Sequence, residues 1–131
     1  MTIERLREYL DIVRLQRETE ERIAELRTRL GLHAVSTDGG GGGGSDSDRL
    51  AAPIARIIEL EEQLAKLADD ANAGKLELLE WLQTVDDVRS KRLIMLRYYD
   101  GKSWSRVANA LGVERNTAQK LHTQIVRKYC Q

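Results

Sequence analysis

The segment that most constrains the fold of this chain is SWSRVANALGVERNTAQKLH, from Ser103 to His122. Its apolar residues recur at a spacing by which two short helices can bury each other, and Ala108 stands where a larger side chain would push them apart. These apolar positions are Val107, Leu111, Val113, Ala118 and Leu121. Gly112 follows the first helix, where a positive φ is needed and glycine adopts it without steric cost. The segment therefore predicts a helix-turn-helix.

The second helix of this motif carries polar side chains on the face opposite its apolar residues. The outward-facing positions are Arg115, Asn116, Gln119, Lys120 and Thr123. Arg and Lys can bind guanine edges or phosphates, and Asn and Gln can pair with adenine. We therefore expect this face to contact the bases of double-stranded DNA in the major groove. The alternative is an ordinary corner of two helices whose polar side chains are only solvated.

Charge divides the chain into two opposite halves. Residues 88–131 carry ten Lys or Arg against two acidic residues, a balance of 10 − 2 = +8, whereas residues 1–87 carry 11 − 19 = −8. A basic C-terminal module provides what electrostatic attachment to phosphates requires. We expect four of its basic residues to bind flanking phosphates, namely Lys102, Arg106, Arg127 and Lys128.

Composition favours an all-α fold and argues against several classes of site. The chain has 131 residues with one Pro, no Phe and 32% charged residues, which is typical of long solvent-exposed helices. Cys130 is the only cysteine, so neither an intramolecular disulfide nor a Cys-based zinc site can form. We expect His33 and His122 to be surface or packing histidines, and we expect neither a metal nor a cofactor.

Neither membrane insertion nor catalysis is expected. The N-terminus is charged from Glu4 onward, and no apolar run approaches the ~20 residues needed to span a bilayer, so we expect a cytoplasmic protein. No nucleophile–base pair or phosphate loop is present, and Asp86 and Asp87 are interpreted as surface charges. The chain is therefore not expected to be an enzyme.

Residues 1–87 are predicted to form a helical hairpin that serves oligomerisation or partner binding. Residues 3–30 have an interrupted amphipathic pattern that ends at Gly31, a plausible C-cap. Residues 34–48, AVSTDGGGGGGSDSD, are predicted to be a flexible non-helical loop, native or introduced as a linker. Pro53 is expected in the first turn of the second helix.

The second long helix carries one continuous apolar seam at alternating three- and four-residue spacing. Its positions are Ile57, Leu60, Leu64, Leu67, Ala71, Gly74, Leu78, Trp81 and Val85. A helix with a single apolar stripe must bury it against a partner. That partner is either residues 3–30 of the same chain or a second copy of the protein.

Residues 88–131 are predicted to form a three-helix module that contains the helix-turn-helix. We expect helices over residues 88–99, 104–111 and 114–129. Ser103 is a natural N-cap, and Trp104 is expected to pack under the adjoining corner rather than stack on a base.

The segment LRYYDGKSWSRVANALGV, from Leu96 to Val113, resembles region 4 of bacterial sigma factors. Its continuation AQKLH is one residue shorter than is usual there. This spacing, together with IARIIELEEQL from Ile54 to Leu64, is similar to a phage- and prophage-encoded family of small proteins related to the ArpU and RinA late-gene transcription regulators. The likeness covers most of the chain from Leu50 onward. Unlike many such proteins, this chain has Glu114 rather than Ser or Thr before the recognition helix, and a small Ala118 within it.

The resemblance implies a sequence-specific DNA-binding transcription regulator of the late-gene activator type. A homodimer is the favoured oligomer, and RNA polymerase is a candidate protein partner. Two alternatives stay open. One is a phage small terminase subunit that recognises packaging DNA, and the other is a sigma-like protein that binds RNA polymerase without DNA.

Overall fold

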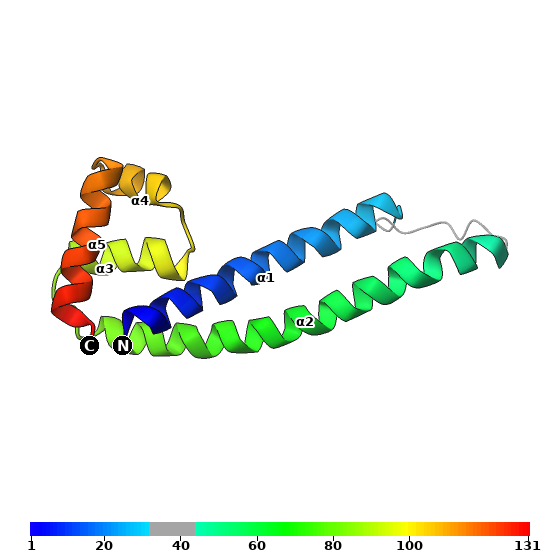
Figure 1. Ribbon diagram of the computed structural model, residues 1–131, viewed down its shortest axis with the longest axis horizontal. Coiled ribbons are helices and arrows are strands. Elements are labelled where there is room, and N and C mark those ends of the chain that lie inside the picture. The colour runs from blue at the N-terminus through cyan, green and yellow to red at the C-terminus, as the bar shows by residue number, and fades with distance from the viewer. Residues whose placement is uncertain (32–43) are drawn as a thin grey trace. The chain divides into compact units, whose positions relative to one another are not determined.

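The computed structural model describes the backbone of residues 1–31 and 44–131 and the side chains of residues 1–31 and 49–131. The fold is all-α, as predicted, and the described part of the chain contains helices and turns but no strands. Figure 1 labels the α-helices in chain order. They are α1 (Ile3–Arg29), α2 (Gly44–Leu82), α3 (Val88–Ile94), α4 (Trp104–Leu111) and α5 (Arg115–Tyr129), with a π-helical segment, η1 (Met95–Tyr99), directly after α3.

The chain divides into two compact units. Unit 1 comprises residues 1–14 and 69–131, and unit 2 comprises residues 15–68. Unit 1 therefore joins the beginning of α1 and the end of α2 to the C-terminal helices, across the predicted domain boundary after residue 87.

Unit 2 is a helical hairpin formed within one chain. Ile23 of α1 is buried together with Ile57 and Leu60 of α2, and half-buried leucines pack around them. Arg27 and Glu61 form a salt bridge between the same two helices. Thr19 interrupts the apolar pattern of α1 but is buried, and its hydroxyl is satisfied by donating to the carbonyl of Leu15 at 2.7 Å. In this unit the first part of the α2 seam is thus covered by α1.

Unit 1 has one apolar core to which all its helices contribute. Leu6 of α1, Leu78 of α2, Leu93 of α3 and Val107 of α4 are each at most 1% exposed, and Ile125 of α5 joins the same cluster. The indole N–H of Trp81 donates to the carbonyl of Tyr129 at 3.2 Å and so ties the end of α2 to the end of α5. The second part of the α2 seam is therefore also buried within the chain.

Three local predictions about the long helices have clear outcomes. Gly31 has φ +68° and ends α1 as expected. The predicted loop 34–48 is wrong for residues 44–48, because α2 begins at Gly44, while residues 34–43 lie outside the described residues. Pro53 is inside α2 rather than in its first turn. Proline removes one intrahelical N–H donor, and this helix continues in both directions from it.

The helix predicted over residues 88–99 is divided into α3 and η1. Asp87 caps α3, since its carboxylate accepts the backbone N–H of Ser90 at 2.9 Å and its hydroxyl at 2.7 Å. These bonds, foremost the one with the Ser90 hydroxyl, lower the pKa of Asp87. In η1 the N–H of Asp100 bonds to the carbonyl of Met95, a five-residue step that α-helical periodicity does not predict.

Candidate nucleic-acid interface

The turn of the helix-turn-helix is formed by local capping at both ends of α4. Ser103 is the N-cap, and its side chain accepts the backbone N–H of Arg106 at 3.3 Å. Gly112 ends the helix with φ +69°, and the next N–H, of Val113, bonds to the carbonyl of Ala108 at 3.0 Å. Both caps were predicted from the sequence, and the observed bounds of α4 equal the predicted ones.

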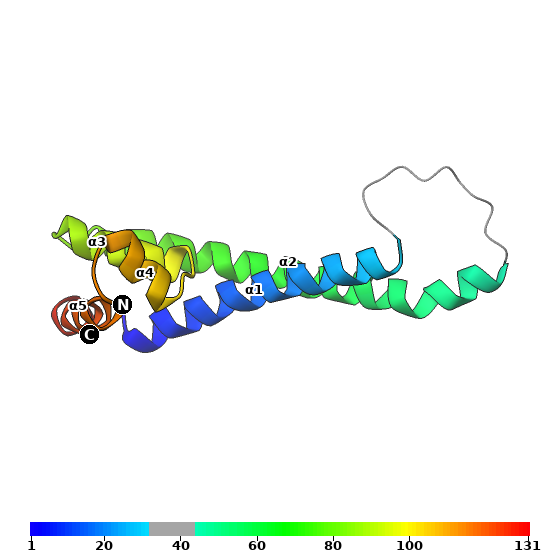
Figure 2. The same cartoon turned by 90° about the horizontal axis from the view of Figure 1, so that it is seen from above.

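Small buried residues allow α4 and α5 to pack closely. Val107 and Ala118 are 0% exposed and Ala108 is 4% exposed. Leu111, Val113 and Leu121 are half-buried around the same core. The inward face predicted for the motif is confirmed, and it determines which residues of α5 face outward (Figure 2, in which α5 is seen nearly along its axis).

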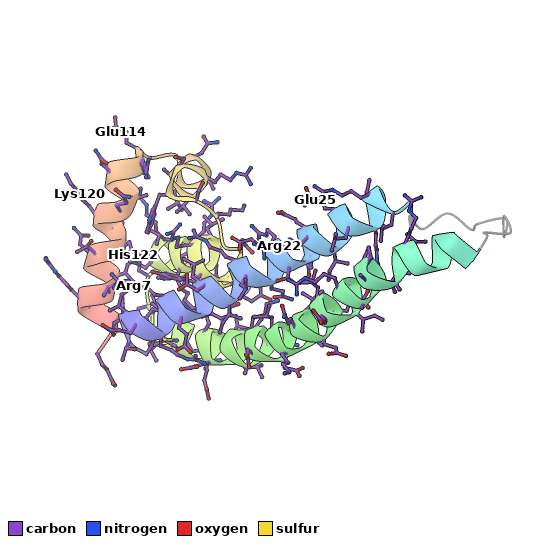
Figure 3. The ribbon with its side chains drawn as sticks, turned by 45° about the vertical axis from the view of Figure 1, so that its right-hand side comes forward. Arg7, Arg22, Glu25, Glu114, Lys120 and His122 are labelled. Atoms are coloured by element: carbon purple, nitrogen blue, oxygen red, sulfur yellow. The ribbon has the colours of Figure 1, made fainter. Side chains whose placement is uncertain are left out.

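The five predicted base-contacting residues all lie on α5. Arg115, Asn116, Lys120 and Thr123 are exposed, and Gln119 is half-buried. Figure 3 shows Lys120 projecting from the outer side of α5, and Glu114 at the beginning of the helix. The hydroxyl of Thr123 donates to the backbone carbonyl of Gln119 at 3.1 Å, which leaves its oxygen able to accept a hydrogen bond. Glu114 is the N-cap of α5 rather than its first residue, and its side chain makes no capping bond.

The four predicted phosphate-binding residues lie in three places around α5. Arg106 is exposed on α4 and lines a shallow hollow together with Arg115. Lys102 is half-buried in the turn before α4. Arg127 and Lys128 are exposed in the last turn of α5, about 20 Å along the helix from Arg115. Lys128 lines a different hollow, which also includes Asp87.

The basic side chains of this surface form no salt bridges in the described part of the chain, although Lys128 lies near enough to Asp87 to help lower the pKa of that carboxylate. Within residues 1–31 and 49–131, no salt bridge involves any of the six predicted DNA-binding Lys and Arg residues. Exposed cations without carboxylate partners are free to attract phosphates, and this surface lies on the half of the chain whose balance is +8.

A cluster of polar and aromatic side chains lies beneath the outward face of α5. The hydroxyl of Tyr98 lies 2.5 Å from Nε2 of His122, and the His122 ring meets the ring of Trp104 edge-on at 5.0 Å between centroids. Burial lowers the pKa of His122 to about 4, helped by the positive charges of Arg97 and Arg7. Burial raises the pKa of Tyr98 to about 12, so the phenol and the imidazole meet as two neutral groups that share one hydrogen bond.

Trp104 packs against the core as predicted, and it also supports an arginine. The guanidinium carbon of Arg97 lies 4.4 Å from the centroid of the Trp104 ring, and Nη1 of Arg97 donates to the carbonyl of Lys102 at 2.9 Å. Arg97 was not predicted from the sequence. Its partners Trp104 and Lys102 are within seven positions of it, but its approach to them follows the π-helical turn of η1, which the residue pattern does not signal.

No group of three or more His, Cys, Asp or Glu residues that could hold a metal ion occurs in the described residues. Among the same residues no helix is both long and apolar enough to span a membrane. No protein-family model, no curated protein and no solved structure matches the chain. The functional argument therefore depends on the geometry of this surface.

Proposed function

We propose that this chain is a sequence-specific DNA-binding transcription regulator, of the phage late-gene activator type that its sequence resembles. The observation that carries this proposal is the outer face of α5. On this face Arg115, Asn116 and Lys120 are exposed and form no salt bridges in the described part of the chain. Helix α4, which ends at Gly112, packs against α5.

In this proposal α5 lies in the major groove and α4 crosses the DNA backbone. The first residues of a recognition helix come nearest to the base edges, which gives this role to Arg115 and Asn116. Gln119, Lys120 and Thr123 follow about one and two turns later on the same face. Arg106 would bind phosphate on one flank, and Arg127 and Lys128 would bind phosphate on the other. Lys102, which precedes α4, is the fourth proposed phosphate-binding residue.

Two protein partners belong to the same proposal. A homodimer would place two recognition helices about one DNA turn, ~34 Å, apart and would read a near-palindromic site. RNA polymerase would be contacted by surfaces outside α5. Exposed apolar side chains of α2, among them Ile58 in unit 2 and Leu76 in unit 1, are available for protein contacts.

Fluorescence anisotropy with a labelled random-sequence duplex tests DNA binding. We expect affinity to fall steeply with salt, and Arg115→Ala/Lys120→Ala to weaken binding about tenfold or more, since each phosphate or base contact contributes on the order of 1 kcal/mol. Arg22→Ala/Arg29→Ala removes the same charge from exposed positions of unit 2 and is the matched control. Equal loss in both double variants, or no binding at low salt, would contradict the assignment to α5.

Light scattering with and without the duplex tests the assembly. A dimer that gains the mass of the duplex supports the regulator. A ring of many copies would indicate a packaging-DNA protein instead, and a particle whose mass the duplex does not change would indicate a surface for binding protein.

A further inference from the structure

A shallow hollow lies at the corner where α4 meets the beginning of α5 (Figure 1). It has a volume of about 440 Å³, and both helices contribute to its walls. The polar side chains that line it are Ser105, Arg106 and Asn109 of α4 and Arg115, the first residue of α5. All four are exposed, so a ligand can reach them from solvent.

The floor of this hollow is held by hydrogen bonds across the turn. The N–H of Val113 bonds to the carbonyl of Ala108 at 3.0 Å, and the N–H of Gly112 bonds to the carbonyl of Asn109 at 3.2 Å. Ala108 is buried and Val113 is half-buried, and both belong to the core between the two helices. The backbone positions that carry the two arginines are therefore fixed relative to each other before a ligand binds, which lowers the entropy lost on binding.

The hollow attracts anions. Two guanidinium groups line it, and no acidic side chain of the described residues does. Neither Arg106 nor Arg115 forms a salt bridge within residues 1–31 and 49–131, and the exposed Glu114 before α5 does not line the hollow. Because Arg115 opens α5, the positive end of the helix dipole adds to its charge. An anion bound between the two side chains would relieve this accumulation of positive charge.

A phosphate suits this hollow better than the edge of a base does. A base presents its donors and acceptors along one flat edge, which side chains of a single recognition helix can reach. A phosphate accepts hydrogen bonds from several directions, which matches donors that converge from two helices. In the proposed docking α4 crosses the DNA backbone, so a hollow in its wall faces phosphates.

We propose that Arg106 and Arg115 hold one phosphate of the DNA backbone in this hollow, together with Ser105 and Asn109. The guanidinium groups supply paired N–H donors, and the hydroxyl and the amide supply single ones. Arg115 then makes a backbone contact in place of the base contact predicted for it, and base reading begins at Asn116. This inference rests on the proposed function and adds Ser105 and Asn109 to the DNA-binding surface.

Salt-dependent anisotropy with the labelled duplex tests whether the two arginines share one phosphate. Each phosphate contact adds about 0.9 to the magnitude of the slope of log affinity against log salt. We expect Arg106→Gln/Arg115→Gln to lower this magnitude by about 0.9, whereas two separate phosphate contacts would lower it by about 1.8. The loss of affinity in the double variant should be about threefold or more smaller than the product of the two single losses, because both side chains serve one ligand.

The matched control is Arg89→Gln/Arg92→Gln, which removes the same charge from exposed positions of α3 in the same unit. It should leave the salt slope unchanged. An equal fall in both double variants would show that the slope reports only the net charge of unit 1, and it would overturn the inference. Circular dichroism should show the wild-type helix content in every variant, because all the changed side chains are exposed.

A charge placed in the hollow gives a second test. Asn109→Asp adds a negative charge without changing the size of the side chain, and it should weaken duplex binding about tenfold because the carboxylate repels the phosphate and pairs with the arginines. Gln124→Glu adds the same charge at an exposed position of α5 outside this hollow, and should weaken binding about twofold at most. Equal losses in the two variants would contradict a phosphate in the hollow.

Selection from a randomised duplex library distinguishes a phosphate contact from a base contact. Loss of a phosphate contact weakens binding uniformly across sequences, whereas loss of a base contact relaxes the preference at one position. We therefore expect Arg115→Gln to select the same sequence as wild type, and Asn116→Ala to lose the preference at one base pair. A changed sequence selected by Arg115→Gln would assign Arg115 to a base and overturn the inference, while the proposed function would stand.

Two further outcomes concern the ligand itself. If wild type binds no duplex at low salt, the proposed function fails and this inference with it. Inorganic phosphate is titrated by calorimetry against chloride of equal ionic strength. If Arg106→Gln/Arg115→Gln loses binding of free phosphate but retains the wild-type affinity for duplex, the ligand is a free anion and the nucleic-acid assignment of this hollow is wrong.

Discussion

Gly74 allows the ring of Tyr9 to lie directly against the backbone of α2. A β-carbon at position 74 would lie 2.3 Å from Cδ2 and 2.8 Å from Cε2 of Tyr9, both far inside contact distance. Tyr9 is 3% exposed, and burial raises the pKa of its hydroxyl to about 12. The glycine in the predicted seam therefore makes room for an aromatic ring from α1.

We predict that Gly74→Ala destabilises the protein by up to about 2 kcal/mol, because overpacking costs about 1–3 kcal/mol and alanine regains ~1 kcal/mol of helix propensity. Urea denaturation measures the free energy of unfolding. Ala73→Gly, at the exposed neighbouring position, should lose about 1 kcal/mol through helix propensity alone. In a Tyr9→Leu background the cost of Gly74→Ala should become smaller, and a gain of stability in wild type would contradict close contact with Tyr9.

His122 makes stability depend on pH. Its pKa is about 4 in the folded protein, against 6.5 for an unperturbed histidine, so the unfolded chain binds the proton more tightly. The contribution of neutral His122 to the stability of the folded protein is complete above pH 6.5, and it is lost as the pH falls towards 4. Because the ring is only half-buried, solvent screening reduces this contribution to about 2 kcal/mol.

We predict that the free energy of unfolding of wild type falls more steeply between pH 6.5 and 4 than that of His122→Gln. The glutamine variant retains a polar side chain that can accept from Tyr98 but does not titrate. Carboxylates contribute equally to both proteins, so the difference between the two curves isolates the histidine. Parallel curves would show that His122 is not desolvated.

At the scale of the elements, α4 and α5 begin with different capping chemistry. Ser103 caps α4 through its side chain, whereas Glu114 has N-cap backbone angles, φ −73° and ψ 154°, but makes no side-chain bond. Serine at an N-cap contributes about 1 kcal/mol relative to a residue that cannot cap. A glutamate at this position retains only its favourable interaction with the helix dipole.

We predict that Glu114→Ser stabilises the protein by about 0.5–1 kcal/mol, the gain of a cap minus the lost dipole interaction. The same change should strengthen duplex binding, because it removes a negative charge at the start of the recognition helix. Thermal unfolding and anisotropy measure the two effects. Glu114→Gln removes the charge without adding a cap, so it should strengthen binding without raising the melting temperature.

Elements whose signals are local were predicted well. The bounds of α4, the left-handed Gly112 and the buried faces of α4 and α5 follow from residues within four positions of each other. The start of α2 and the break between α3 and η1 were predicted wrongly. A glycine or proline lowers helix propensity by a few kcal/mol at most, and the surrounding structure can outweigh it.

At the scale of the whole molecule, the two units differ in the size of their apolar cores. Among the described residues, the cluster of unit 2 has three buried side chains, Ile23, Ile57 and Leu60, whereas the cluster of unit 1 draws residues from α1 to α5. Regions with fewer buried contacts open at a lower free energy. We therefore expect unit 2 to exchange its amide hydrogens sooner than unit 1.

We predict that Leu6→Ala lowers the protection of amides in α4 and α5, although residue 6 is about a hundred positions away from them in the chain. Leu6 is 0% exposed in the shared core, and its truncation should cost about 2–5 kcal/mol. Hydrogen exchange with mass spectrometry locates the effect. Leu26→Ala in unit 2 is the control and should affect only residues 15–68, while unchanged α5 protection in Leu6→Ala would contradict the shared core.

The sequence by itself determined the helical class, the capped helix-turn-helix and the concentration of positive charge in residues 88–131, because periodicity, caps and net charge are properties of neighbouring residues. Only the tertiary structure decided which surface covers the seam of α2. It also decided that the first turns of α1 belong to the core of the C-terminal helices. Such arrangements depend on side chains far apart in the chain, whose mutual packing has no signature in either segment alone.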